Sequence, residues 1–426
     1  MDKRVYEEYI EILKEELVCA MGCTEPIALA YGAALARKVL DEEVREVKVI
    51  ASSNIIKNVK SVVVPNTGGQ KGIQAATAAG IVAGNADAEL RVLAEVSEED
   101  KKAMRTFIET IPMTIKASDK DYVFHILVEL KGEEHTSSVE IAGFHTNVIA
   151  VTLDDKVLDA KDYEEQGNNY KTDRSLLSVE SIVQFADEAK LEEVDELLNK
   201  QIDYNLAIAE EALAGDYGAN IGKILLKSYG DSVFNKAKAY AAAGSDGRMN
   251  GCELPVVINS GSGNQGLTTS LPVIVYAEEL KASKEELLRA LLVSNLVTIH
   301  LKTGIGRLSA YCGATSAGCG AAAGICYLYG GKYYEIAHTI VNALAINSGM
   351  ICDGAKASCA AKIASSVEAG LLGLQMQRCD KEFYGGDGIL EKGVENTIRN
   401  IGNLASVGMR ETDRTIIEMM TKNTGC

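Results

Sequence analysis

The stretch Leu308-Ser-Ala-Tyr-Cys-Gly-Ala-Thr-Ser-Ala-Gly-Cys-Gly-Ala-Ala-Ala-Gly-Ile-Cys-Tyr-Leu-Tyr-Gly-Gly331 carries no charged side chain over 24 residues. Small residues dominate it, whereas a membrane-spanning helix would be rich in Leu and Ile. Gly313 and Gly318 interrupt any single span, and the spacing of Gly320 and Gly324 is typical of closely packed helices. We therefore predict a helix buried in a helical region and no membrane partner.

The sequence on either side of this stretch divides the chain into two parts. From about residue 191 onward, Ala/Leu-rich segments with helical spacing alternate with Gly-rich breaks. Before it, helical segments alternate with β-branched runs joined by short turns. Because 426 residues exceed what one hydrophobic core usually organises, we expect two domains. The predicted fold class is α+β, with an N-terminal domain of helices and a mainly antiparallel sheet (1–190) and an all-α C-terminal domain (191–426).

Periodicity places the elements of the N-terminal part. Apolar residues recur at helical spacing in three segments, and the second begins with a proline in its first turn. Alternating or β-branched runs predict strands. The expected helices are 5–17, 26–40 and 73–82, and the expected strands are 44–50, 61–65, 122–130, 137–142 and 147–153.

Charge and cysteine content limit the classes of function. The net charge of −17 and the lack of a basic cluster argue against a nucleic-acid partner. The charged N-terminus has no apolar signal region, so we expect a cytoplasmic, reducing location. In that setting the ten cysteines should be metal ligands, catalytic groups or buried side chains and not disulfides.

Five cysteines lie close together near the C-terminal end, and most are seven residues apart. On a helix this spacing returns to the same face, which is typical of a packing stripe, and we interpret Cys319 and Cys326 in this way. Cys312 and Cys352 instead lie beside Gly-rich turns, and Cys359 follows seven residues later. Thiolates without interleaved His suit an iron–sulfur cluster or zinc, although this spacing matches no common ferredoxin or zinc-ribbon pattern.

A further cysteine, Cys23, lies in the turn Met21-Gly-Cys-Thr-Glu-Pro26 before a predicted helix. The positive end of a helix dipole favours a thiolate there. Such a thiolate could act as a nucleophile, a metal ligand or a general base. A cysteine that simply packs in the turn is the alternative.

The stretch Asn259-Ser-Gly-Ser-Gly-Asn-Gln-Gly266 contains the pattern Gly-x-Gly-x-x-Gly. Its surroundings are helical and not βαβ, so a dinucleotide site is the weaker interpretation. We expect a turn whose N–H groups and side chains bind a small carboxylate. The residues concerned are Ser262, Gly263 and Asn264, and the turn Asn66-Thr67-Gly68 of the other domain could contribute in the same way.

These motifs together resemble the L-cysteine desulfidase family, which is related to the iron–sulfur L-serine dehydratases. The resemblance rests on the Cys23 turn and its helix, on residues 259–266, and on the set Cys312, Cys352-Asp353 and Cys359. Where the dehydratases have a Ser-Ser-His-Thr type of segment, this chain has Cys23-Thr24-Glu25-Pro26. That departure favours the desulfidase branch.

The resemblance implies a [4Fe-4S] cluster with one open iron, bound by Cys312, Cys352 and Cys359. It implies a pyridoxal-independent α,β-elimination that converts L-cysteine and water to pyruvate, ammonia and hydrogen sulfide. Cys23 would be the base that removes the α-proton. In the competing assignment, Cys23 is the third ligand and Cys359 is structural.

Some expectations stay open at this point. Cys426 could cap the resting cluster, as a terminal cysteine does in some dehydratases, or belong to a tail. An L-serine dehydratase of the same fold and a non-enzymatic iron–sulfur or thiol sensor are the alternative functions. Whether the chain forms a homodimer does not follow from its sequence.

Overall fold

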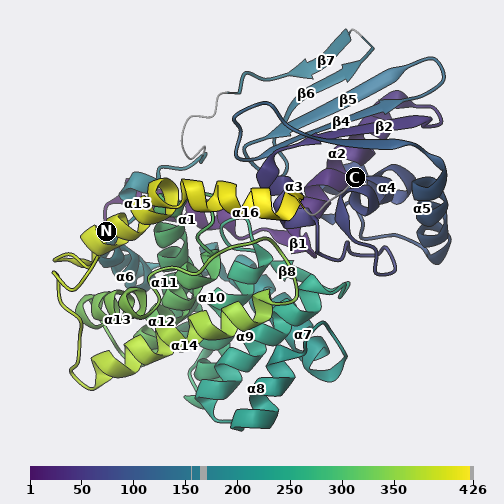
Figure 1. Cartoon of the computed structure of the whole chain (residues 1–426). Coiled ribbons are helices and arrows are strands. Elements are labelled where there is room, and N and C mark those ends of the chain that lie inside the picture. Colours follow the sequence, from purple (N-terminus) through teal and green to yellow (C-terminus); the bar gives the residue numbers. More distant parts are fainter. Residues whose placement is uncertain (155, 164–169, 423–426) are drawn as a thin grey trace.

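The computed structural model describes residues 1–154, 156–163 and 170–422. It confirms the α+β class, with a mixed sheet and its helices beside a larger helical part (Figure 1). Among the described residues, no helix is long and apolar enough to cross a membrane. The uncharged stretch forms the buried helix α12 (Gly313–Leu328), as the sequence predicts.

A six-stranded sheet organises the N-terminal part, in the order β3-β2-β4-β5-β6-β7. Only the β2–β3 pair is parallel, and each other pair is antiparallel. Apolar residues alternate along the central strands because one face of the sheet packs against α2. The strands are β2 (Glu46–Ala51), β3 (Met113–Ala117), β4 (His125–Lys131), β5 (Thr136–Ala142), β6 (Val148–Leu153) and β7 (Lys156–Ala160), and the helices are α2 (Thr24–Leu40), α3 (Ser53–Val59), α4 (Gly72–Ala83), η1 (Ala86–Arg91) and α5 (Glu98–Thr110).

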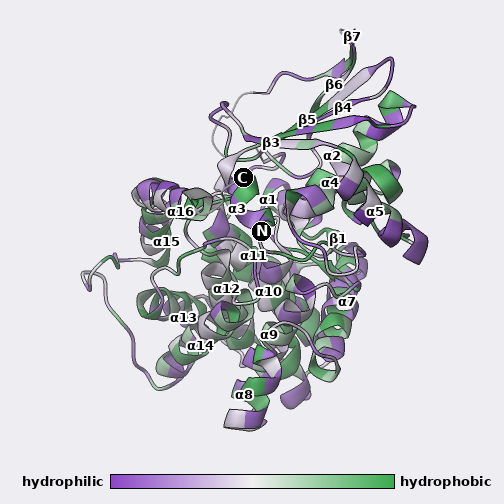
Figure 2. Cartoon of the chain, turned by 45° about the vertical axis from the view of Figure 1, so that its right-hand side comes forward, coloured by the Kyte–Doolittle hydropathy of each residue, from purple (hydrophilic) through white to green (hydrophobic). Residues whose placement is uncertain are grey.

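Helices form the C-terminal part, around the buried pair α10 and α12. Figure 2 shows α8 at the edge of this part that is farthest from the sheet. Gly320 of α12 lies against Ser294 and Thr298 of α11, where a larger side chain would collide. The helices are α6 (Val179–Glu188), α7 (Asp195–Ala214), α8 (Ile221–Tyr229), α9 (Val233–Met249), α10 (Gly263–Glu279), α11 (Lys284–Ile305), α12, α13 (Tyr333–Ile346), α14 (Cys359–Arg378), α15 (Val394–Asn403) and α16 (Arg410–Lys422).

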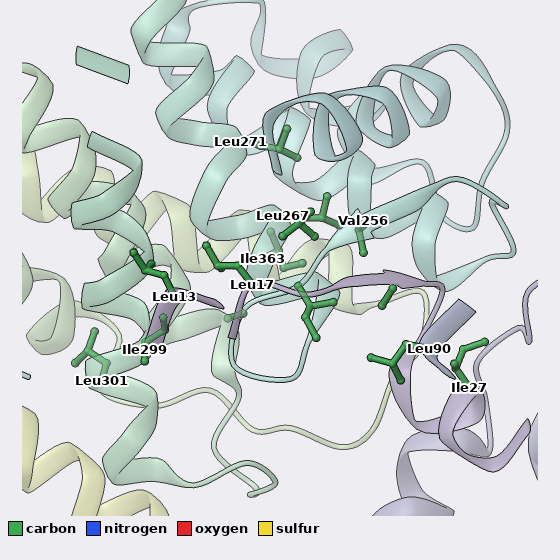
Figure 3. Close-up of a cluster of buried hydrophobic side chains, with 14 of the residues drawn as sticks. Leu13, Leu17, Ile27, Leu90, Val256, Leu267, Leu271, Ile299, Leu301 and Ile363 are labelled. Atoms are coloured by element: carbon green, nitrogen blue, oxygen red, sulfur yellow. The ribbon is translucent and has the colours of Figure 1, made fainter. Parts of the chain in front are cut away.

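The two parts are joined through the N-terminal segment. After α1 (Lys3–Glu16), the strand β1 (Cys19–Met21) pairs antiparallel with β8 (Pro255–Val257), immediately before the turn 259–266. Figure 3 shows one apolar cluster at this junction, to which α1, α2, β8, α10 and α11 contribute. Both α1 and α6 pack against α11, although they lie on the N-terminal side of residue 190. The division at residue 190 itself stays a prediction.

The strand predicted over 61–65 is wrong. These residues form turns, and Val63 makes only an isolated bridge with Lys71. Val62, Val63 and Val64 are all buried, so the run does not alternate between a core face and a solvent face. Its backbone donors instead reach Met249 and Gln70. Its apolar character therefore reflects burial between the two parts of the chain and not membership of a sheet.

Candidate functional site

One cavity at the junction of the two parts gathers most of the residues that the sequence singles out. Cys23 lies on its N-terminal wall, and Cys312, Cys352 and Cys359 lie on its C-terminal wall. Ser262 and Asn264 of the Gly-rich turn also line it, and Gly263 lies directly behind Arg248. Residues separated by more than 300 positions in the sequence thus face one space.

Four helices begin at this cavity. The capping or first residues are Cys23 for α2, Ser262 for α10, Cys312 for α12 and Cys359 for α14. Each helix start carries unpaired N–H groups and a partial positive charge. The buried side chains of Lys57, Lys302 and Arg248 also line the cavity. Lys57 is paired with Asp413, and burial lowers the pKa of Lys302 to about 8, so both remain positively charged near pH 7. The site is therefore electrostatically suited to anions, although the whole chain is acidic.

Cys312 and Cys352 are held side by side by their backbones. Tyr311 and Ile351 form an isolated bridge, in which Cys312 N donates to Met350 O and Cys352 N to Ala310 O, each at 2.7 Å. The thiol of Cys312 donates a hydrogen bond to Cys352 and lowers the pKa of Cys352 to about 6, despite burial. Lys57 and Lys302 act in the same direction. Cys352 is thus the cavity thiol best prepared to be a thiolate, which is the form that binds metal.

Cys359, the first residue of α14, is the third thiol on the C-terminal side of the cavity. Its Sγ lies 3.8 Å from Gly354 O, and burial raises the pKa of its thiol. Among the described residues, no three His, Cys, Asp or Glu side chains are close enough to bind one metal ion. Three thiols distributed over one wall, with no His between them, instead fit a cluster in which each iron takes its own cysteine.

Cys23 is paired with an acid. Its Sγ donates to Oε2 of Glu25 at 3.1 Å, and Glu25 Oε1 accepts from Asn58 Nδ2 at 3.0 Å. Burial, and then the charge of Glu25, raise the pKa of Cys23 well above its usual value. The expected effect of the helix dipole is therefore outweighed, and the resting group is a thiol and not a thiolate. Its proton already faces a carboxylate that can accept it.

Glu25 is ionised although it is buried. Burial raises its pKa, but the charge of His145 when it is protonated, hydrogen bonds from the Cys23 thiol and the backbone, and the charge of Arg248 outweigh burial and leave the pKa below the usual value. Burial also lowers the pKa of His145 to about 4, so its ring is neutral near pH 7. The Nε2 atom of His145 has no hydrogen-bond partner, and neither has Nε of Arg248. These two buried polar atoms belong to cavity-lining residues and are available to a ligand.

The Gly-rich turn places Arg248 in the cavity. Arg248 donates from an Nη atom to Oδ1 of Asn264 at 3.0 Å. A Cβ at position 263 would lie 2.2 Å from Nε of Arg248, so glycine is required there. The strand before the turn is a three-residue antiparallel strand, and no parallel βαβ unit surrounds it. The turn therefore lacks the βαβ setting of a dinucleotide site, and its role in binding a carboxylate stays a prediction.

Other predicted residues lie elsewhere. Asn66 donates to Leu93 O at 2.6 Å and Thr67 to Val64 O at 2.7 Å, while Gly68 lies beside Arg105. None of these three lines the cavity, so their substrate-binding role stays a prediction without structural support. Cys426 lies outside the described residues. Cys319 and Cys326 are buried within α12 and belong to the core cluster.

Sequence reasoning missed most of the polar residues of the cavity. Glu25 belongs to the turn that contains Cys23, and no sequence motif includes Lys57, Arg248 or Lys302. Nothing in their local sequence marks them, because the fold alone brings them to the thiols. The one available signal was the position of Glu25, two residues after Cys23.

Comparisons with known proteins agree with this architecture. Residues 87–418 match the family described as serine dehydratase alpha chain, so the chain belongs to that family. The family is associated with lyase-type, dehydratase-like enzymes and with iron–sulfur clusters.

Full-length relatives are also known. A UPF0597 protein of Desulfitobacterium hafniense is 57% identical over 417 residues, which cover 98% of this chain and 97% of the relative. One from Lachnoclostridium phytofermentans is 49% identical over 416 residues, covering 98% and 100%. One from Bacteroides thetaiotaomicron is 37% identical over 428 residues, covering 99% of each.

Proposed function

We propose that the chain is a pyridoxal-independent L-cysteine desulfidase that uses a [4Fe-4S] cluster. The observation that carries this proposal is one cavity lined both by three thiols and by the Cys23–Glu25 pair. The three thiols have the chemistry to hold metal, and the Cys23–Glu25 pair has the chemistry to move a proton. An α,β-elimination needs both.

Cys312, Cys352 and Cys359 would hold the cluster. Lys57, Lys302 and the helix starts offset the negative charge of thiolates in a buried place. When bound through three cysteines, such a cluster supplies an open iron that acts as a Lewis acid toward the leaving sulfur. This assignment favours Cys359 as the third ligand, because Cys23 is already bonded to Glu25.

The substrate carboxylate would bind at the Gly-rich turn. Arg248 has an unpartnered Nε, and its guanidinium is held by Asn264 against Gly263. Ser262 and the N-terminal N–H groups of α10 lie beside it. A guanidinium and a helix start together hold a carboxylate in one orientation, which directs the α-carbon into the cavity.

Proton transfer would proceed through the Cys23–Glu25 pair. Glu25 takes the thiol proton, and the resulting Cys23 thiolate removes the α-proton of the substrate. Loss of hydrosulfide from the β-carbon then leaves aminoacrylate. Its imine tautomer reacts with water to give pyruvate and ammonia, so one cysteine and one water are consumed for each sulfide released.

A second candidate is L-serine dehydratase, which the family description favours. It would use the same residues with hydroxide as the leaving group. The preference of iron for sulfur over oxygen, and the thiol–carboxylate pair at positions 23 and 25, favour cysteine.

Turnover by anaerobically purified protein with a full complement of iron tests the proposal. We expect equal amounts of pyruvate and sulfide from L-cysteine without added pyridoxal phosphate, and a lower kcat/KM for L-serine. A higher kcat/KM for L-serine would replace the desulfidase with the dehydratase. No pyruvate from either amino acid would refute both.

A further inference from the structure

A second cavity, which we call the outer cavity, shares lining residues with the proposed catalytic cavity. Its walls come from the end of α1, from η1 and from the residues around Thr146 and Thr172. Arg307, His145 and Gly261 line both cavities, so these three residues form the partition between them. They come from the α11–α12 connection, the β5–β6 turn and the Gly-rich turn, respectively.

Arg307 is held in this partition mainly by aromatic rings. Its guanidinium carbon lies 5.1 Å from the ring centre of Tyr170 and 5.8 Å from that of Phe144. Its only ion pair among the described residues is with Glu16, at 3.6 Å, which is longer than a normal hydrogen bond. Stacked guanidinium groups keep their donor edges available, and the Arg307 side chain is 20% exposed.

Glu16 does not depend on Arg307 for a partner. Its Oε1 accepts a hydrogen bond from Arg174 at 2.8 Å, and its side chain is 2% exposed. An incoming carboxylate can therefore replace Glu16 on Arg307 without leaving a buried charge unpaired. His145, whose unpartnered Nε2 is buried in the same partition, offers a further polar contact.

We propose that the outer cavity is the binding site at which a small amino-acid substrate first docks, and that Arg307 is its carboxylate receptor. Exchange of Glu16 for the substrate carboxylate on Arg307 opens the partition and passes the ligand toward Arg248. The cavity wall also carries the carboxylates of Glu11, Glu15 and Glu89. The chemical class admitted is therefore a small amino acid, whose carboxylate Arg307 binds and whose ammonium group these acids can pair. This inference rests on the proposed function for the identity of the ligand, but its geometry depends only on the two cavities.

Chemical labelling of Cys23 in the anaerobic, full-length protein tests the route without turnover. Iodoacetate carries a carboxylate, and iodoacetamide is its neutral analogue of similar size. The ratio of the two labelling rates at Cys23, measured by mass spectrometry at one pH, reports selection for a carboxylate. In Arg307→Gln we expect this ratio to fall about tenfold, because one charge-assisted interaction is lost.

Two further variants control for charge and geometry. Arg307→Lys keeps the charge but loses the planar guanidinium group. The preference for iodoacetate over iodoacetamide should therefore be reduced but not abolished. Arg45→Gln removes the same charge from an exposed ion pair that lines neither cavity, and should leave the ratio unchanged. An unchanged ratio in Arg307→Gln would overturn the proposal.

Blocking the outer cavity tests the route itself. Val18 lines this cavity alone and is 37% exposed, so Val18→Trp should slow labelling by both reagents. Leu280→Trp, at a residue with the same exposure outside both cavities, should not. Unchanged rates in Val18→Trp would refute this route. Failure to turn over L-cysteine, with labelling as expected, would refute the proposed function alone.

Discussion

Cys352 and Cys23 line the same cavity but lie in opposite electrostatic surroundings. On the C-terminal wall, Cys352 accepts a hydrogen bond from a second thiol and lies near two lysines, which lowers its pKa to about 6. On the N-terminal wall, Cys23 is buried beside Glu25, which raises its pKa. Cys352 is therefore the thiol prepared to be a thiolate, whereas Cys23 keeps a proton on sulfur next to a carboxylate.

This difference shows that a cysteine at a helix start is not by itself a thiolate. Cys23 and Cys312 both occupy the capping position of a helix, yet burial and neighbouring groups raise the pKa of both thiols well above the usual value. Neighbouring charges outweigh the partial charge of the helix end when they are close and shielded from water.

The largest effect should follow from breaking the metal-binding wall. Cys352→Ala should lower bound iron about tenfold or more, because the cluster loses a ligand and the thiol with the lowest pKa. Iron content after anaerobic purification measures this effect. Cys319→Ala, in the core of α12, is the matched control and should keep its iron while losing about 1 kcal/mol of stability. Equal iron loss in both variants would contradict the assignment.

The next effect should follow from breaking the proton-handling wall. Glu25→Gln keeps the shape of the side chain but removes the proton acceptor, so kcat should fall about 10²- to 10⁴-fold. Iron content should not change. Glu129→Gln, which alters a sheet-surface pair with Lys48, should change neither quantity. Loss of iron in Glu25→Gln would mean that the two walls are not functionally separate.

The smallest effect concerns the loss of unfolding free energy in acid that the buried His145 causes. The folded-state pKa of His145 is about 4, below the usual 6.5, so the unfolded chain binds the additional proton between these values. The contribution of neutral His145 to the stability of the folded state is complete above pH 6.5 and is lost as the pH falls toward 4. Between pH 7.5 and 5, His145→Gln should therefore lose about 2 kcal/mol less unfolding free energy than the unaltered protein.

Urea unfolding at the two pH values measures this difference. His135→Gln is a suitable control, because His135 is exposed on the sheet and its Nδ1 atom pairs with Asp154. The His135→Gln variant should still lose unfolding free energy in acid, because His145 is unchanged. A pH dependence in His145→Gln equal to that of the unaltered protein would contradict a neutral, buried His145.

The periodicity of apolar residues correctly predicted helices and strands whose burial pattern is set within a few residues. The helix over 26–40 and the strand over 137–142 agree closely with α2 (Thr24–Leu40) and β5 (Thr136–Ala142). It failed at 61–65, where burial between two parts of the chain produces an apolar run without a strand. It also gave no indication that β1 pairs with β8, more than 230 residues away, which brings Cys23 to the Gly-rich turn.

The sequence by itself determined the α+β class, the buried character of α12 and the thiols that stand beside turns. These properties follow from side-chain size, periodicity and the backbone preferences of glycine, all of which act over a few residues. Only the tertiary structure decided that Glu25 holds the Cys23 proton, that Lys57 and Lys302 face Cys352, and that Arg307 separates two cavities. A pKa or a cavity depends on charges and burial contributed by distant segments, and those segments meet only after folding.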